Sequence, residues 1–101
     1  MEYFEVGTKK DILYWSKRLY QKGMSPATSG NISVRTDRGI LISSSGVCLN
    51  DMSEEDIVLI DFDGNLIEGN KKPSNEKFMH AQIYDLRDDI SAIIHSHCPY
   101  I

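Results

Sequence analysis

The sequence contains no long apolar run and no cluster of basic residues. A membrane-spanning helix needs about 20 consecutive apolar residues, and a nucleic-acid surface needs Lys and Arg gathered on one face. No basic run is longer than a pair such as Lys9-Lys10 or Lys71-Lys72, and the net charge is −4. We therefore expect neither a membrane nor a nucleic acid as partner, and we expect a small molecule as ligand.

Cysteine is also scarce. Cys48 and Cys98 are the only two, and they lack the C-x-x-C spacing of common metal and redox motifs. Thiols in this arrangement are more often free, in a reducing compartment, than joined in a disulfide. The acidic start, Met1 to Glu5, is unlike the basic start of a signal peptide. These features predict a cytoplasmic protein, and 101 residues predict one domain or part of one.

Histidine occurs three times, and two copies form the motif His95-Ser96-His97. In a strand, side chains two residues apart share a face and lie about 7 Å apart, so both imidazoles can reach one metal ion. The motif alone is weak, because two polar residues on an exposed strand face have the same spacing. The preceding apolar run, Ala92 to Ile94, predicts a buried strand with the histidines at its end. Cys98 would point to the opposite face, so we do not expect it to be a ligand.

Alternating and apolar segments predict an antiparallel sheet. Residues 32–35 and 40–42 are expected to form a β-hairpin, and Asp63-Gly64 is expected to be the turn of another between 57–60 and 66–67. With helices packed on this sheet, the predicted fold class is α+β, with a central, mostly antiparallel sheet and flanking helices.

Two helices are predicted. Thr8 to Asp11 resembles a capping box and predicts a helix that ends near Gly23. Pro73-Ser74 predicts the start of a second helix, with Glu76 in its first turn and Asp88-Asp89 at its end. Each helix has an apolar face, formed in the first by Ile12, Trp15 and Leu19 and in the second by Phe78, Met79, Ile83 and Leu86. Core packing is the simplest interpretation of both faces.

Three stretches of small polar residues come directly before or after these elements: residues 28–31, 44–46 and 74–75. Glycine lets the backbone approach an anion, while hydroxyl, amide and helix-start N–H groups donate hydrogen bonds to it. Each stretch taken singly is more often ordinary turn chemistry. In combination they predict a site for a phosphate group, and no nucleotide is implied because the sequence has no Walker pattern.

Four segments, residues 28–35, 42–46, 72–76 and 95–97, resemble the class II aldolase/adducin family and occur in the family's order. The resemblance covers nearly the whole chain but only the N-terminal half of the family's domain. It implies a three-layer α/β/α arrangement, in which residues 1–101 form a single domain that is incomplete at its C-terminus, and a symmetric homo-oligomer.

The resemblance also implies the roles of individual residues. Zn²⁺ would be bound by His95 and His97, with Glu76 as the catalytic acid/base. The substrate phosphate would be bound by residues of the three polar stretches: Thr28, Gly30, Asn31, Ser45, Gly46, Ser74 and Asn75. The family's third zinc histidine lies beyond the His-x-His pair. His80, one helical turn after Glu76, is expected to pack or hydrogen-bond near the site rather than bind the metal.

The activity implied by the resemblance is a zinc-dependent aldolase reaction. A phosphorylated ketose, such as a ketose 1-phosphate, would be cleaved to dihydroxyacetone phosphate and an aldehyde through a metal-stabilised enediolate. Two alternatives use the same groups: dehydration of the methylthioribulose-1-phosphate type, and sugar-phosphate epimerisation. Alternatives of another class are a non-catalytic scaffold, like the head of adducin, and a fragment that is inactive by itself.

Overall fold

The structure, a computed structural model, describes residues 2–22 and 30–95. Its helices and strands are, in chain order, α1 (Glu2–Gln21), β1 (Asn31–Arg35), β2 (Ile40–Ser43), β3 (Ile57–Ile60), β4 (Leu66–Glu68), α2 (Lys77–Leu86) and β5 (Ala92–His95). The five strands form one sheet in the order β4-β3-β2-β1-β5, and every neighbouring pair is antiparallel. Among the described helices, none combines the length and apolar character that crossing a membrane requires. The predicted α+β class with a mostly antiparallel sheet is confirmed.

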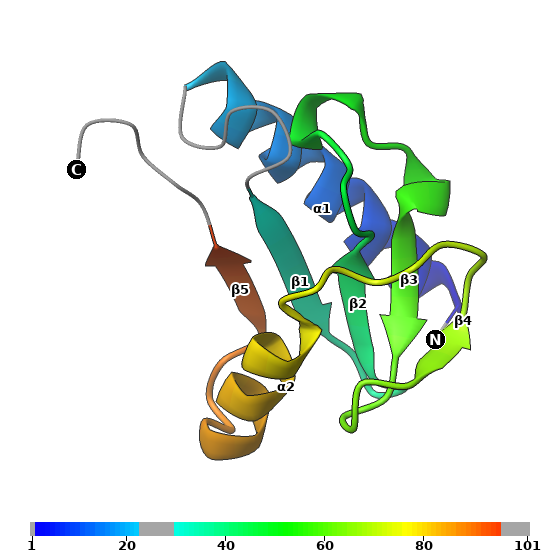
Figure 1. Ribbon diagram of the computed structural model, residues 1–101, viewed down its shortest axis with the longest axis vertical. Helices are drawn as coiled ribbons and strands as arrows, with labels where there is room; N and C mark the ends of the chain where they lie inside the picture. Colours follow the sequence, from blue (N-terminus) through cyan, green and yellow to red (C-terminus); the bar gives the residue numbers. More distant parts are fainter. Residues whose placement is uncertain (1, 23–29, 96–101) are drawn as a thin grey trace.

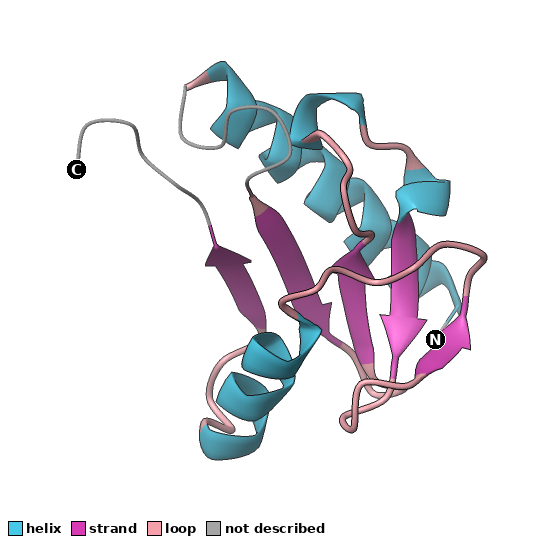
Figure 2. Ribbon diagram, viewed as in Figure 1, coloured by secondary structure: helices cyan, strands magenta, loops and turns pink. Residues whose placement is uncertain are grey.

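The two helices cover opposite faces of the sheet, which gives three layers (Figures 1 and 2). Because side chains alternate along a strand, β2 contributes to both faces. Leu41 packs toward α1 in a core that includes Ile12, whereas Ile40 and Ile42 pack toward α2 in a core that includes Ala81. Strand β3 alternates in the same way, and both strands are buried along their whole length.

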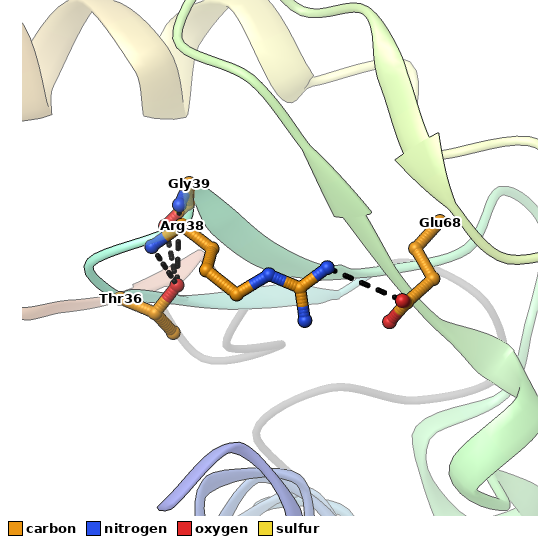
Figure 3. A network of polar contacts seen from close by, with 4 residues as sticks. All are labelled: Thr36, Arg38, Gly39 and Glu68. Carbon is orange, nitrogen blue, oxygen red and sulfur yellow. Dashed lines mark hydrogen bonds and ion pairs between the residues drawn. The ribbon is translucent and has the colours of Figure 1, made fainter. Parts of the chain in front are cut away.

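The turn between β1 and β2 is held by side-chain hydrogen bonds, as Figure 3 shows. The Thr36 hydroxyl accepts hydrogen bonds from the backbone N–H groups of Arg38 and Gly39, at 3.1 and 3.2 Å. The Arg38 guanidinium then reaches Glu68 of β4 at 3.2 Å. Gly39 has a φ of +149°, and a Cβ there would lie 2.3 Å from the backbone oxygen of Ile60. The turn therefore requires glycine for both conformation and space.

Helix α1 differs from its prediction at both its start and its buried face. It begins at Glu2 and continues through Thr8, so the capping box predicted at Thr8 was wrong. From Lys9 to the end of the helix, the buried side chains are Ile12 and Ser16, four residues apart on one face, while Trp15 is 53% exposed. Trp15 lies at the edge of the packed face, beside an open apolar groove that Ile94 also lines. The predicted helix end near Gly23 lies outside the described residues.

Helix α2 and strand β5 also depart from their predictions. The helix begins at Lys77, and Glu76 is its N-cap residue rather than part of its first turn. Its buried residues are His80, Ala81 and Tyr84, whereas Phe78 and Leu86, predicted to belong to the apolar face, are exposed. Strand β5, predicted to be buried, lies at the edge of the described sheet and alternates between exposed and half-buried residues.

Candidate functional site

The site begins where β1 starts and the described part of β5 ends. Asn31 and His95 occupy paired positions on these antiparallel strands, so their side chains extend from the same face. Nδ2 of Asn31 lies 3.4 Å from Nδ1 of His95, a long contact for a hydrogen bond. Asn31 is buried and His95 is half-buried. A predicted phosphate ligand and a predicted zinc ligand are thus neighbours.

The Asn31 amide also contacts helix α2. Its Oδ1 atom lies 2.5 Å from Nε2 of His80, and the other ring nitrogen of His80, Nδ1, lies 2.6 Å from the Ser33 hydroxyl. Ser33 in turn lies 2.9 Å from the Tyr84 hydroxyl. These contacts form a chain in the order Tyr84, Ser33, His80, Asn31 and His95. His80 therefore packs and hydrogen-bonds near the site, as the sequence predicted.

The electrostatics of this chain follow from its burial. His80 has no exposed surface, and burial, with a smaller contribution from the nearby His95, lowers its pKa to about 4. Burial likewise raises the pKa of Tyr84 above its ordinary value, although the hydrogen bond with Ser33 and the charge of Arg35 oppose the rise. At neutral pH both groups are uncharged, so the chain consists of neutral hydrogen-bonding groups.

Arg35, at the end of β1, fixes the other end of α2. Its guanidinium donates hydrogen bonds to the backbone oxygens of Tyr84 and Arg87, at 2.6 and 2.8 Å, and lies 4.8 Å from the centre of the Tyr84 ring. A positive charge at a helix C-terminus interacts favourably with the helix dipole. Strand β1 therefore holds α2 through Arg35 at the C-terminus and through Ser33 and Asn31 nearer the N-terminus.

Two of the three polar stretches predicted to bind phosphate are paired by their backbones. The N–H of Ser45 donates to the carbonyl of Lys72 at 2.8 Å, and the N–H of Ser74 donates to that of Ser43 at 3.0 Å. Ser44 and Pro73 form an antiparallel bridge between these two bonds. The loop after β2 and the segment before α2 therefore lie side by side.

The third stretch joins the same region through β1. The backbone N–H of Ile32, next to Asn31, donates to the Ser43 hydroxyl at 3.2 Å in the protein interior. Gly46 has a left-handed φ of +74° and is exposed, and among the described residues no atom beyond its two chain neighbours lies within 4 Å of where its Cβ would be. The described parts of all three stretches thus gather beside the start of β1. Thr28 lies outside the described residues.

Glu76 lies at the start of α2, in the turn that follows this region. The Ser74 hydroxyl accepts a hydrogen bond from the Glu76 backbone N–H at 3.2 Å, and the Glu76 carbonyl accepts one from the N–H of His80 at 3.2 Å. The Glu76 side chain and Asn75 are exposed, whereas Ser74 is buried. Glu76 is therefore one helical turn from the residue that contacts Asn31.

The structure brings His95 to this region, whereas His97 and Cys98 lie outside the described residues. Within residues 2–22 and 30–95, no three side chains of the His, Cys, Asp and Glu types form a metal-binding group. No motif of the sequence predicts a role for Ser33, Tyr84 or Arg35. Ser33 sits at a polar position of an alternating strand, which normally indicates exposure, and only the partners on α2 explain its burial.

Comparison with known proteins identifies the family. The sequence model described as the class II aldolase and adducin N-terminal domain matches residues 10–101. The chain belongs to the class II aldolase and adducin family. The fold agrees, because a solved L-fuculose 1-phosphate aldolase superimposes with a TM-score of 0.85 at 38% identity, covering 91% of this chain and 44% of that one.

Curated relatives of this class II aldolase family member carry different activities in their names. A 5-deoxy-D-ribulose 1-phosphate aldolase from Bacillus thuringiensis serovar kurstaki is 38% identical over 94 residues, which are 91% of this chain and 44% of the relative. A methylthioribulose-1-phosphate dehydratase from Azotobacter vinelandii is 38% identical over 89 residues, which are 87% of this chain and 43% of the relative. The chain thus spans less than half the length of these relatives.

Proposed function

We propose that the protein containing this chain is a zinc-dependent aldolase acting on a phosphorylated ketose. The single observation that carries the proposal is the gathering of His95, Asn31 and the two backbone-paired serine loops at one end of the sheet. The relatives named above support a sugar phosphate as substrate, since three of their names refer to ketose 1-phosphates.

The donor set fits zinc. Imidazole nitrogen and carboxylate oxygen are common zinc ligands, and a histidine ligand usually has a hydrogen-bond partner on its other ring nitrogen. Asn31 is such a partner for His95. In the proposal His95 and His97 would hold the ion, which would supply Lewis-acid chemistry for negative charge that develops on the substrate oxygens.

The chain's own residues would then bind, orient and move a proton. The hydroxyl groups of Ser45 and Ser74, together with the backbone of Gly46, would hold the phosphate at a helix start whose dipole favours an anion. Holding the phosphate fixes the far end of the substrate and orients its reacting carbons. The carboxylate of Glu76, exposed at the same helix start, would accept and return the proton.

A second function, dehydration of a ketose 1-phosphate, is favoured by one observation: the dehydratase from A. vinelandii is as similar to this chain as the aldolase from B. thuringiensis, at 38% identity each. Epimerisation would use the same metal and phosphate groups. A cytoplasmic location and a symmetric homo-oligomer belong to the same proposal, on the basis of cysteine content and the family resemblance.

The metal is tested with this chain alone. Zn²⁺ is expected to raise the thermal unfolding midpoint, because a ligand that binds only the folded state stabilises it. The double variant His95→Ala and His97→Ala should lose that rise, and Mg²⁺, which prefers oxygen ligands, should not produce it. An unchanged response to zinc in the double variant would place the metal elsewhere.

The reaction is tested with the whole protein that contains this chain. L-fuculose 1-phosphate and 5-deoxyribulose 1-phosphate are incubated with it, and dihydroxyacetone phosphate is measured. Glu76→Gln should lower turnover by roughly 10²–10⁴-fold, the usual loss for a general acid/base, while the control Glu55→Gln, at another exposed position, should not. Loss of water from the sugar without carbon–carbon cleavage would establish the dehydratase instead.

A further inference from the structure

The hydrogen-bonded chain from Tyr84 to His95 has a direction. In the arrangement of the structure, the Nε2–H of His80 donates to Oδ1 of Asn31, and Nδ2 of Asn31 donates to Nδ1 of His95. With its Nε2 protonated, neutral His80 must accept at Nδ1, so the Ser33 hydroxyl donates to it. The Tyr84 hydroxyl can then donate to Ser33, so each of the four contacts has one donor and one acceptor, and the ring N–H of His80 and the hydroxyl protons of Ser33 and Tyr84 all have acceptors.

This direction has a consequence for His95. If Nδ1 of His95 accepts from Asn31, a neutral His95 ring carries its proton on Nε2. Nε2 then has no lone pair for a metal ion. A histidine that binds a metal through Nε2 carries its proton on Nδ1 and donates it to an oxygen. The direction that gives an acceptor to the protons of the buried Tyr84, Ser33 and His80 is therefore the one in which Nε2 of His95 is blocked as a ligand.

Rotation of the Asn31 amide by half a turn reverses the chain. Its oxygen then accepts from Nδ1–H of His95, and its nitrogen donates to Nε2 of His80, which must move its own proton to Nδ1 and donate to Ser33. The Ser33 hydroxyl can take either role. The reversed direction leaves one hydroxyl proton, on Ser33 or Tyr84, to find another acceptor, so it is disfavoured without a metal.

We propose that binding of a divalent metal ion by His95 reverses the direction of these hydrogen bonds and moves the proton of the buried His80 from Nε2 to Nδ1. This inference rests on the proposed metal site. The change is balanced. Each ring keeps one proton, the metal takes the lone pair of Nε2 of His95, and no proton is released by either ring. His80 is thus a positioning residue: through Asn31 it sets which nitrogen of His95 is available.

Burial explains why the reversal extends to His80. The ring has no exposed surface, and its two nitrogens contact Asn31 and Ser33. If the Asn31 amide turned while His80 kept its proton, an N–H would face an NH₂ group and both would lose a buried hydrogen bond. The two groups therefore change together.

The test is nitrogen NMR of this chain with ¹⁵N-labelled histidine, because protonated and unprotonated ring nitrogens resonate in well-separated regions. His80→Gln assigns the signals of His80. Without metal, Nε2 of His80 is expected to be the protonated nitrogen. On addition of ZnCl₂, the two nitrogens of His80 should exchange their positions in the spectrum, while Nε2 of His95 shows metal binding.

The other outcomes separate this inference from the proposed function. Metal binding at His95 with the His80 proton still on Nε2 would overturn the reversal and leave the metal site intact. No change at either ring would overturn both. The exchange itself is observed in the unaltered sequence, and His80→Gln serves only to assign the signals of His80.

A variant tests the role of Asn31. In Asn31→Asp the side chain only accepts, so both rings should donate to it: His95 from Nδ1 and His80 from Nε2, already without metal. Zinc should then leave the proton of His80 in place. The control Asn70→Asp makes the same chemical change at an exposed position and should show the exchange seen in the unaltered chain. Movement of the His80 proton by zinc in Asn31→Asp would overturn the relay through Asn31.

Discussion

The Ser33 hydroxyl lies 2.6 Å from Nδ1 of His80, in a fully buried contact that joins the middle of β1 to α2. A charged imidazolium would have both nitrogens protonated and would lack the solvation that water provides. Because burial disfavours the charged ring, the pKa of His80 falls to about 4. This lowered pKa makes the stability of the fold depend on pH.

The first prediction is a loss of stability on acidification. The unfolded chain binds a proton at His80 near pH 6.5, whereas the folded chain binds it only near pH 4. Unfolding therefore takes up a proton in this window, and the free energy of unfolding falls as the pH decreases from 6.5 to 4, by up to about 3 kcal/mol. Urea denaturation at several pH values measures it.

His80→Gln provides the control for this prediction. Glutamine can donate and accept hydrogen bonds but does not titrate, so the variant should show a flatter profile between pH 6.5 and 4. The lowered pKa values of Asp56 and Asp61 act at still lower pH. An equally steep profile in His80→Gln would assign the pH dependence to other groups.

The second prediction concerns Arg35, whose guanidinium holds the C-terminus of α2. Arg35→Ala removes two hydrogen bonds to backbone oxygens of Tyr84 and Arg87 and should lower the free energy of unfolding by about 1–3 kcal/mol. The control Arg38→Ala breaks the exposed pair with Glu68 and should cost less than about 1 kcal/mol. Equal losses, measured by urea denaturation, would contradict the role of Arg35.

The third prediction compares two glycines that both have positive φ. Gly39→Ala places a Cβ 2.3 Å from the Ile60 oxygen, whereas the Cβ of Gly46→Ala has no atom of the other described residues within 4 Å, apart from its chain neighbours. Both variants pay the cost of a left-handed or similarly strained backbone, roughly 1–2 kcal/mol, but only Gly39→Ala forces β1–β2 away from β3. The thermal midpoint of Gly39→Ala should fall further. Similar midpoints would show that the turn can shift without cost.

The fourth prediction tests the phosphate site at Gly46. Asn and Asp both tolerate a left-handed backbone, so Gly46→Asn and Gly46→Asp differ mainly in charge. A carboxylate within several Å of a bound phosphate should weaken it by roughly tenfold or more, since about 1.4 kcal/mol is tenfold. Binding of inorganic phosphate, measured by calorimetry, should fall in Gly46→Asp only. Equal affinities in both variants would place the phosphate elsewhere.

The local elements of the fold could be predicted from the sequence because their signals are local. A hairpin turn depends on residues that are adjacent in the sequence, such as Asp63-Gly64. The predicted turns therefore identified the pairs β1–β2 and β3–β4 correctly. The faces of α2 could not be predicted this way, because Phe78 is more apolar than His80 and yet is 62% exposed. His80 is buried because its two ring nitrogens form hydrogen bonds with the side chains of Asn31 and Ser33. These partners lie 49 and 47 residues away in the sequence.

The candidate site was predicted from motifs, and the structure added the groups that hold them. The loops at Ser45 and Ser74 were expected to meet, and their backbones pair. The roles of Glu76, His95 and the phosphate-binding residues stay predictions. The supporting chain through Ser33 and Tyr84 gave no sequence signal, because a serine in a strand and a tyrosine in a helix are each ordinary until they are packed together.

The pairing of β1 with β5 also determines when the site can form during synthesis. Asn31 and His95 are 64 residues apart, and they meet only when β5 docks beside β1. Closing so long a loop is slow compared with forming the hairpins β1–β2 and β3–β4, whose partners are close in sequence. As the chain leaves the ribosome, both hairpins can therefore assemble first, and the histidine reaches the asparagine only after residue 95 has emerged. Assembly of the site is in this sense a late event of folding.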